Sequence, residues 1–167
     1  QLWCSDDADL VVIATRHNSH AELVCKALDS GKHVFVEKPL ALTYEEIREI
    51  ETAYRKNYGK YKVMVGFNRR FSPFVRKIKD LMEFSSSPMS INMIINAGSI
   101  AADHWTQNDK IGGGRIVGEA CHFIDLARFL TGYKIIDSSI NYMSGQGVNT
   151  FDTTVISLKF SDGSIAS

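Results

Sequence analysis

Two short stretches of the sequence place proton-transfer side chains where an enzyme could use them. Lys38 stands in Glu37-Lys38-Pro39, directly after a short apolar run from His33 to Val36. A lysine at the end of a buried strand points into a crevice, where partial desolvation favours the neutral, proton-accepting amine. A surface lysine before a loop proline is the plain alternative. On these residues alone, both interpretations stay open.

His122 is the second candidate, on a predicted helix that ends near Leu130. Glu119 and Asp125 stand three residues to either side of it, and at helical spacing they can share its flank. Carboxylates fix the tautomer of a histidine and suit it to proton transfer, although a surface ion cluster would show the same pattern. We expect no metal site at Cys121, because neighbouring helix positions diverge by about 100°.

The elements that must position these side chains alternate between strand and helix in the first part of the chain. Apolar runs at 9–15, 33–36 and 62–67 predict strands of a parallel sheet buried on both faces. Capping boxes at Ser19/Glu22 and Thr43/Glu46 open the two helices between them. This is the pattern of a Rossmann-type α/β sheet with helices on both faces. The loops after Thr15, Val36 and Phe67 should then line one crevice.

The second part of the chain has a different pattern. Ser72-Pro73 predicts the start of a helix with its apolar residues inward, namely Phe74, Val75, Ile78, Leu81 and Met82. A Ser-rich break at 85–88 follows, and period-two stretches at 89–95, 140–143 and 153–160 predict a mostly antiparallel sheet. Gly112 to Gly114 precede the helix of His122. We therefore expect a Rossmann part over residues 1–70 and a partial α+β domain over 71–167.

Composition limits the classes of partner. The 167 residues are 44% hydrophobic and carry 19 basic and 19 acidic side chains, so a globular fold is expected and a nucleic-acid footprint is not. No apolar run is long enough to cross a membrane. Three cysteines without a CxxC pair favour a reducing compartment, and we expect the cytoplasm. A small molecule is the expected ligand.

Three stretches together resemble the Gfo/Idh/MocA oxidoreductases. They are VVIATRHNSHAELVCKALDSGKHVFVEKPLA at 11–41, VGFNRRF at 65–71 and GGGRIVGEACHFIDLARFL at 112–130. The resemblance implies hydride transfer between NAD or NADP and a secondary alcohol of a sugar, cyclitol or nucleotide sugar. It also implies a homo-oligomer that pairs through the C-terminal sheet.

The resemblance assigns roles to individual residues. It implies Lys38, His122 and Glu119 as catalytic residues, and Thr15, Asn18, His20, Glu37, Lys38, Asn68 and Arg69 as cofactor contacts. Substrate contacts would be Lys38, Arg70, Asp125 and His122. The chain departs from the family at Gly118, where the usual pattern has an aspartate four residues before the histidine. Either Glu119 replaces that carboxylate or the position is vacated.

The family begins with a strand and a GxGxxG turn, which this sequence does not contain. Those glycines let the backbone approach the pyrophosphate at a helix N-terminus. Because the chain begins with Gln and its last hairpin strand stops at once, we expect a fragment that is inactive by itself. The alternative function is a non-catalytic interaction or oligomerisation domain with a degenerate dehydrogenase site.

Overall fold

The computed structural model describes residues 3, 5, 7–82, 87–144 and 152–167. It contains two compact units. Unit 1 is Gln1–Gly66 with Trp105–Gly118, and unit 2 is Phe67–His104 with Glu119–Ser167. The segment 105–118 thus returns to unit 1 and is called the returning segment. The predicted single division after residue 70 does not place it there.

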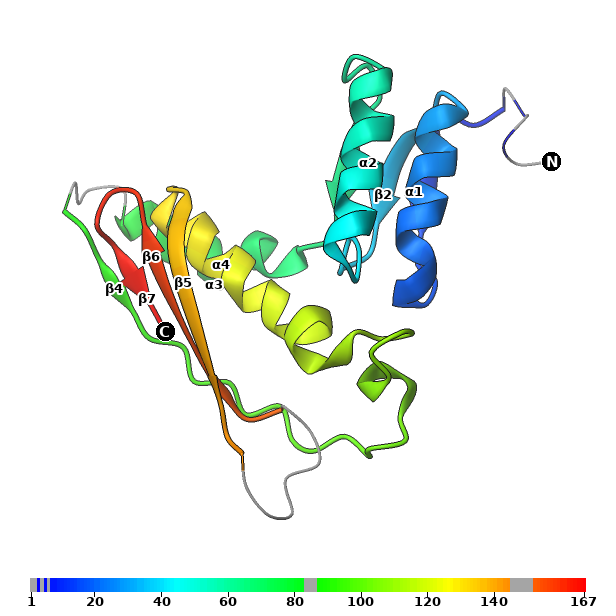
Figure 1. Cartoon of the computed structure of the whole chain (residues 1–167). Helices are drawn as coiled ribbons and strands as arrows, with labels where there is room; N and C mark the ends of the chain where they lie inside the picture. Colours follow the sequence, from blue (N-terminus) through cyan, green and yellow to red (C-terminus); the bar gives the residue numbers. More distant parts are fainter. Residues whose placement is uncertain (1–2, 4, 6, 83–86, 145–151) are drawn as a thin grey trace. The chain divides into compact units, whose positions relative to one another are not determined.

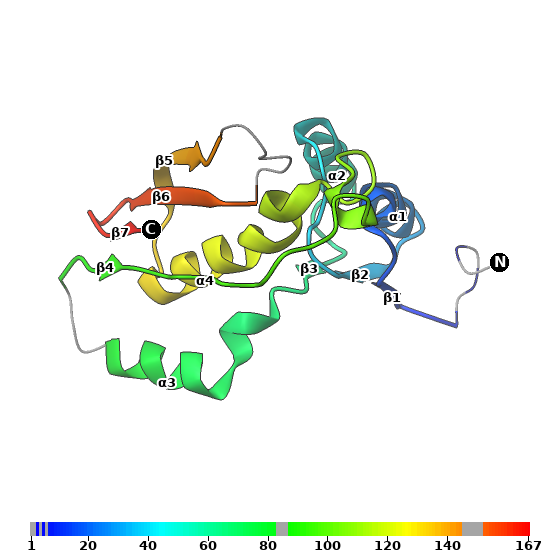
Figure 2. The same cartoon turned by 90° about the horizontal axis from the view of Figure 1, so that it is seen from below.

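Unit 1 is built on a three-stranded parallel sheet. Its strands β1 (Leu10–Ile13), β2 (His33–Val36) and β3 (Val63–Val65) lie in the order β1-β2-β3. The connecting helices α1 (His20–Asp29) and α2 (Tyr44–Lys56) cover the same face of this sheet (Figure 1, Figure 2). Consecutive strands that step in one direction, joined by crossovers of one hand, place their helices on one side. The predicted α/β fold is confirmed, whereas helices on both faces are not found among the described residues.

The core of unit 1 lies between this sheet and its two helices. Val11, Ile13, Val34 and Val36 point towards the helices and are at most 6% exposed, and Val24 and Leu28 of α1 are fully buried against them. The opposite face holds Leu10, Val12 and Met64, which are 52%, 64% and 47% exposed. The prediction of strands buried on both faces is therefore wrong for this chain as described.

The two predicted capping boxes have different outcomes. At α2 the Glu46 amide donates to Thr43 Oγ1 over 3.2 Å, and the Thr43 amide donates to Glu46 Oε2 over 3.1 Å. At α1 the box is wrong, because Ser19 Oγ donates back to the Arg16 carbonyl over 2.9 Å. A 3-10 turn, η2 (His17–Ser19), already precedes the helix. It gives Ser19 a helical backbone, which aims its hydroxyl away from the next turn.

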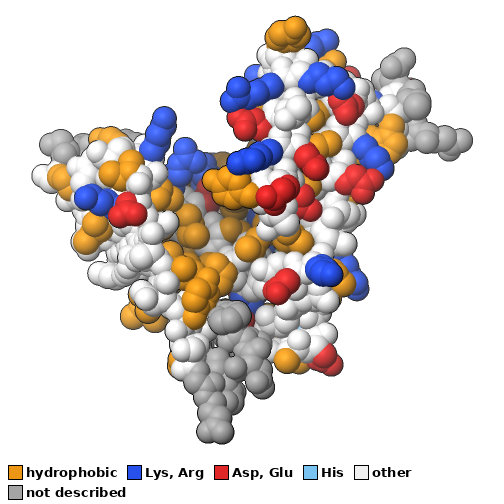
Figure 3. Space-filling view, viewed as in Figure 1, with side chains coloured by type: hydrophobic (Ala, Val, Ile, Leu, Met, Phe, Trp, Pro, Cys, Tyr) orange, Lys and Arg blue, Asp and Glu red, His pale blue; other side chains and the backbone are white. Residues whose placement is uncertain are grey.

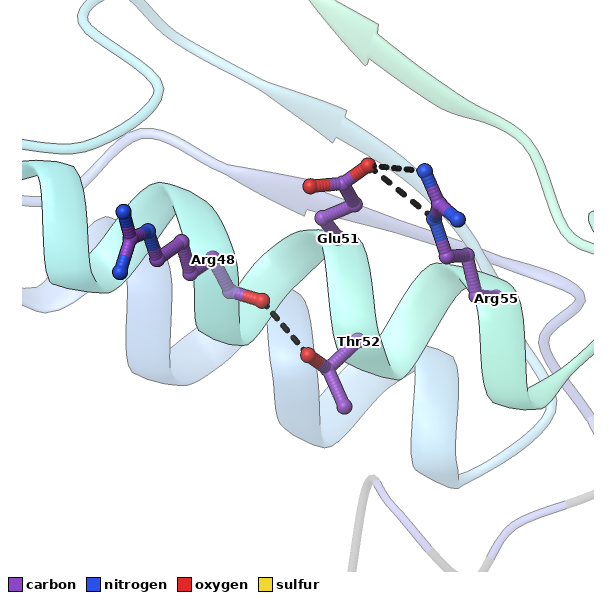
Figure 4. A network of polar contacts seen from close by, with 4 residues as sticks. All are labelled: Arg48, Glu51, Thr52 and Arg55. Carbon is purple, nitrogen blue, oxygen red and sulfur yellow. Dashed lines mark hydrogen bonds and ion pairs between the residues drawn. The ribbon is translucent and has the colours of Figure 1, made fainter.

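The outer face of α2 is polar. Arg55 donates twice to one oxygen of Glu51, and Thr52 Oγ1 donates to the Arg48 carbonyl over 2.8 Å (Figure 4). Basic and acidic side chains are interspersed on the side of α1 and α2 that Figure 3 shows. Exposed ion pairs of this kind contribute about 0 to 1 kcal/mol each. No basic patch of the kind that binds nucleic acid is seen on this face.

Unit 2 carries a four-stranded sheet in the order β4-β7-β6-β5. The strands are β4 (Ser90–Ile91), β5 (Ile135–Tyr142), β6 (Thr154–Phe160) and β7 (Ile165–Ala166). β5, β6 and β7 pair antiparallel and β4 pairs parallel with β7, which confirms a mostly antiparallel sheet. The helix α4 (Cys121–Thr131) packs on it through Ala127, against Leu158, Phe160 and Ala166.

Helix α3 (Pro73–Met82) begins at the predicted proline, after the 3-10 turn η3 (Asn68–Phe71). Three of the five residues predicted to point inward do not: Phe74, Ile78 and Leu81 are 82%, 47% and 61% exposed, whereas Val75 and Met82 are half-buried. The described part of the chain places no layer over this stripe, and α3 is tied to α4 by a bond from Lys79 Nζ to the Leu130 carbonyl. The expected strand at 89–95 shrinks to β4, and the Ser-rich break lies partly outside the described residues.

Two further expectations from the sequence concern membrane-spanning helices and self-association. In the part of the chain that the structure describes, no helix is long and apolar enough to cross a membrane. Self-association through the C-terminal sheet stays a prediction.

Candidate active site

Lys38 follows β2 and is half-buried in unit 1. Its Nζ donates a hydrogen bond to the Gly118 carbonyl over 2.6 Å, and the Lys38-Pro39 peptide is cis. An ammonium has three N–H groups, so this bond fixes the direction of the amine and leaves two donors for another oxygen. The predicted crevice lysine is thus held by a backbone carbonyl from the returning segment.

Glu37 directly follows β2 and contacts the ends of both neighbouring strands. Its amide donates to the Ile13 carbonyl over 2.9 Å, which continues the ladder between β1 and β2. Its carboxylate lies against Gly66, where an added Cβ would stand 3.0 Å from Oε2. A glycine at 66 therefore leaves space for this carboxylate at the end of β3. These contacts support a structural role for Glu37, while the predicted cofactor contact stays a prediction.

The loop after β1 contains the other predicted cofactor residues of unit 1. Thr15 and Asn18 are exposed, and the Asn18 amide donates to the Ile111 carbonyl over 3.1 Å. His20 is fully buried, with Nδ1 2.7 Å from the Pro39 carbonyl and Nε2 3.1 Å from the Thr15 carbonyl. Both ring nitrogens face backbone oxygens. His20 therefore links two loops, and its predicted cofactor contact stays a prediction.

His17 was missed by the sequence reasoning. Its ring is 9% exposed and its Nδ1 donates to the Gly112 carbonyl over 2.8 Å. The edge of its ring meets Trp105 at a centroid distance of 4.9 Å, and the Arg16 guanidinium lies 5.5 Å from the centre of the Trp105 ring. The Gly112 partner of His17 is 95 residues away in the chain, so no local pattern could have indicated this bond.

The returning segment needs glycine at the point where it meets His17. A Cβ on Gly112 would stand 2.3 Å from the Thr106 Cα atom, a distance that no side chain tolerates. The predicted glycine run is thus explained by close backbone packing. This glycine run was the sequence feature that could have indicated close packing of a distant segment against the loop after β1.

Unit 2 holds the remaining predicted residues, and it pairs two of them with each other. Arg70 binds both carboxylate oxygens of Asp125, with Nε 3.0 Å from Oδ2 and Nη2 bonded to Oδ1. Asp125 is 8% exposed, and the Arg70 guanidinium lies 5.3 Å from the centre of the Phe129 ring. The two predicted substrate contacts thus bind each other in the described chain, and contact of either with a substrate stays a prediction.

Asn68 and Arg69 are exposed in η3. The guanidinium of Arg69 lies 4.3 Å from the centre of the Phe123 ring, a distance at which cation–π attraction operates. Arg69 is therefore docked on α4. A cofactor contact for either residue stays a prediction.

His122 lies in the first turn of α4 and is half-buried, with its ring 6.1 Å from that of Phe67. The turn before it, η5 (Ile116–Ala120), is a π-helix. A π turn holds one more residue than an α turn, so the α-helical spacing used to set Glu119 beside His122 does not apply there. Asp125 is turned to Arg70 instead. The catalytic roles of His122 and Glu119 stay predictions.

Burial and two neighbouring charged groups shift the pKa of His17, which lies near Lys38. Burial lowers the pKa of His17 most, the bond to the Gly112 carbonyl acts against this, and the charges of Lys38 and His20 lower it further. A neutral imidazole thus stands near the Lys38 amine. Among the described residues, no group of three or more His, Cys, Asp or Glu side chains is placed to hold a metal ion. The arrangement suits proton transfer to or from an oxygen atom.

Comparisons with known proteins indicate the relatives of this chain. Residues 1–67 match the family described as the GFO_IDH_MocA oxidoreductase family, NAD-binding Rossmann fold. The chain is 28% identical to myo-inositol 2-dehydrogenase of Thermotoga maritima, over 95% of this chain and 48% of that protein. It is 33% identical to levoglucosan dehydrogenase of Pseudarthrobacter phenanthrenivorans, over 76% of this chain and 34% of that protein.

Solved structures show the same fold. The crystal structure of an oxidoreductase domain protein from Kribbella flavida superimposes with a TM-score of 0.83 at 28% identity, over 99% of this chain and 48% of that one. The chain thus spans about half the length of the curated relatives it matches. By the match of residues 1–67, this part of the chain is similar to the NAD-binding Rossmann region of the Gfo/Idh/MocA oxidoreductases.

Proposed function

We propose that the protein carrying this chain transfers hydride between NAD or NADP and a secondary alcohol of a sugar, cyclitol or nucleotide sugar. The observation that carries the proposal is the amine of Lys38, held at the end of β2 by the Gly118 carbonyl with two N–H groups to spare. The names of the inositol and levoglucosan dehydrogenases among the relatives support the substrate class.

The reaction needs one proton transfer that Lys38 can perform. When an alcohol is oxidised, its O–H proton goes to a base while the carbon loses hydride, which the nicotinamide accepts when bound. In the reverse direction the Lys38 ammonium donates a proton to the carbonyl oxygen. Fixing the amine in one direction keeps it within hydrogen-bond reach of that oxygen. We assign Lys38 this role, with His122 and Glu119 as a second proton-transfer pair.

The described residues fit part of a dinucleotide site. Thr15 and Asn18 are exposed polar side chains beyond the carboxyl end of β1, where ligands of such sheets bind. They would hold the ribose or nicotinamide side of the cofactor. The glycine-rich turn for the pyrophosphate is not in this sequence, so we expect tight cofactor binding only in the whole protein.

The test is turnover of the whole protein with NAD and NADP over a panel of cyclitols and sugars. Lys38→Met should lower kcat about 10²- to 10⁴-fold, the usual loss for an acid–base group. Lys26→Met is the matched control, because Lys26 lies on the exposed face of α1, paired with Glu22. If Lys38→Met turns over like Lys26→Met, Lys38 has no catalytic role.

Cofactor binding separates this proposal from a degenerate interaction domain. A dehydrogenase gains stability from a cofactor that binds its folded state, about 2.7 kcal/mol at a hundred times the dissociation constant. Thermal unfolding should therefore shift upward with NADH or NADPH. A whole protein that shows neither this shift nor turnover would be the interaction domain.

A further inference from the structure

His17 lies where the loop after β1 meets the returning segment of unit 1. Its Nδ1 is 2.8 Å from the Gly112 carbonyl. A carbonyl can only accept, so Nδ1 carries the hydrogen, and in the neutral ring Nε2 is then the nitrogen with the lone pair. The tautomer of His17 is thus set by the backbone.

The same ring packs on the residue that receives the Lys38 amine. An added Cβ on Gly118 would stand 3.2 Å from Cε1 of His17 and 3.5 Å from the Gly112 carbonyl oxygen. The Gly118 carbonyl accepts the bond from Lys38 Nζ over 2.6 Å. His17 therefore bonds to Gly112 at one end of segment 112–118 and fills the space beside Gly118 at the other end, whose carbonyl accepts the bond from the lysine. The imidazole occupies the space in which a side chain at 118 would begin.

The charges around His17 keep its ring neutral. The titratable groups that face it are Lys38, after β2, and His20, on α1, and both lower its pKa together with burial. The nearby guanidinium of Arg16 is stacked on Trp105. A positive charge on His17 would repel that of Lys38, so this arrangement favours the neutral imidazole.

We propose that His17 is the positioning residue of Lys38: it holds segment 112–118 so that the Gly118 carbonyl meets the amine, and Gly118 lacks a side chain because the imidazole takes that space. The inference rests on the proposed function only in giving Lys38 a catalytic role. The contacts themselves are testable in this chain without any turnover.

The first experiment is a nitrogen-15 NMR titration of the histidines in this chain. The His17 signal is assigned by its loss in His17→Asn. It should show the Nδ1–H tautomer, and its titration midpoint should rise in Lys38→Met, which removes the facing charge. Lys38→Arg is the matched control and should keep the midpoint, because it keeps the charge. An Nε2–H tautomer, or the same midpoint in Lys38→Met and wild type, overturns the proposal.

The second experiment tests the packing of His17 on Gly118. Gly118→Ala places a methyl group 3.2 Å from Cε1 of His17, a tight contact that the ring relieves only by shifting, so we expect a lower unfolding midpoint. The same substitution made in a His17→Ala background should cost much less, because the opposing atoms are gone. A double-mutant cycle of the four proteins measures this coupling. Additive effects would show that the two residues do not form a pair.

The third experiment reads the effect on Lys38 in the whole protein. His17→Ala should lower kcat about tenfold or more, as a loosened catalytic group does, with the cofactor KM nearly unchanged. His17→Asn retains a donor for the Gly112 carbonyl, so it should recover most of kcat but lose the acid limb of the pH profile. Unchanged kcat and pH profile in both variants refute the positioning role. A whole protein without turnover refutes the proposed function, and the NMR midpoints then decide the His17 inference alone.

Discussion

Replacement of Arg70 by methionine should destabilise unit 2, because it strands a buried carboxylate. Asp125 is 8% exposed, the Arg70 side chain is 32% exposed, and the guanidinium binds both carboxylate oxygens. Removing one partner of a fully buried ion pair costs about 3 to 5 kcal/mol, whereas exposed pairs contribute about 0 to 1 kcal/mol. Since a third of Arg70 meets water, we expect Arg70→Met to lower the free energy of unfolding by about 2 to 3 kcal/mol.

Hydrogen exchange measured by mass spectrometry on peptides from α4 is the suitable assay. Both tryptophans, Trp3 and Trp105, lie in unit 1, so fluorescence does not follow this change. A loss of 2 to 3 kcal/mol corresponds to roughly 30- to 150-fold faster exchange of the most protected α4 amides. Arg55→Met is the matched control, because Arg55 donates the same two bonds to Glu51 on the exposed face of α2.

The combined variant Arg70→Met/Asp125→Leu should recover much of the lost protection, since it removes both charges together. If Arg70→Met changes the exchange of α4 no more than Arg55→Met changes that of α2, the reasoning is refuted. Arg70 and Asp125 would then be available to a substrate, as the sequence suggested.

Three further results are expected in this chain. The pKa of His17 is lowered below 6.5 in the folded protein, so the unfolded chain binds more protons. The stability that this group gives unit 1 is therefore full above about pH 6.5 and is lost as pH falls through the folded pKa. Urea unfolding followed by tryptophan fluorescence should show this loss in wild type and not in His17→Asn. Thr43→Ala removes the cap of α2 and should cost about 1 kcal/mol in the same assay, against almost no loss in Thr52→Ala within the helix; equal losses would contradict the capping role. Burial, with the charge of Glu49, raises the pKa of the Cys25 thiol, so iodoacetamide at pH 8 should alkylate it more slowly than a free cysteine, and mass spectrometry showing the free-cysteine rate would contradict this.

The sequence predicted the elements whose causes are local. The alternation of apolar runs and the Thr43/Glu46 box specify β1 to β3 and α2, because short-range hydrogen bonds and burial decide them. The box at Ser19 failed because a 3-10 turn preceded the helix, and apolar periodicity did not show which layer would cover α3.

The candidate site could be predicted only in part for the same reason. The place of Lys38 directly after β2 is a local feature that the sequence predicted, whereas its catalytic role stays a prediction. His17 was missed because its partner Gly112 comes from a distant part of the chain, and the link from His20 to Pro39 also joins separate loops. Asp125 was read as a neighbour of His122 by spacing, whereas tertiary packing gave it to Arg70.

The return of residues 105–118 to unit 1 has a consequence for anyone who exchanges parts between relatives. A gene fragment cut after residue 70 would encode the three strands and both helices, yet it would omit the carbonyl groups of Gly112 and Gly118 that hold His17 and Lys38. A chimaera that takes its cofactor domain from one parent must therefore take this later segment from the same parent. In this protein the surroundings of Lys38 come from two separate stretches of sequence, and recombination after residue 70 would separate them.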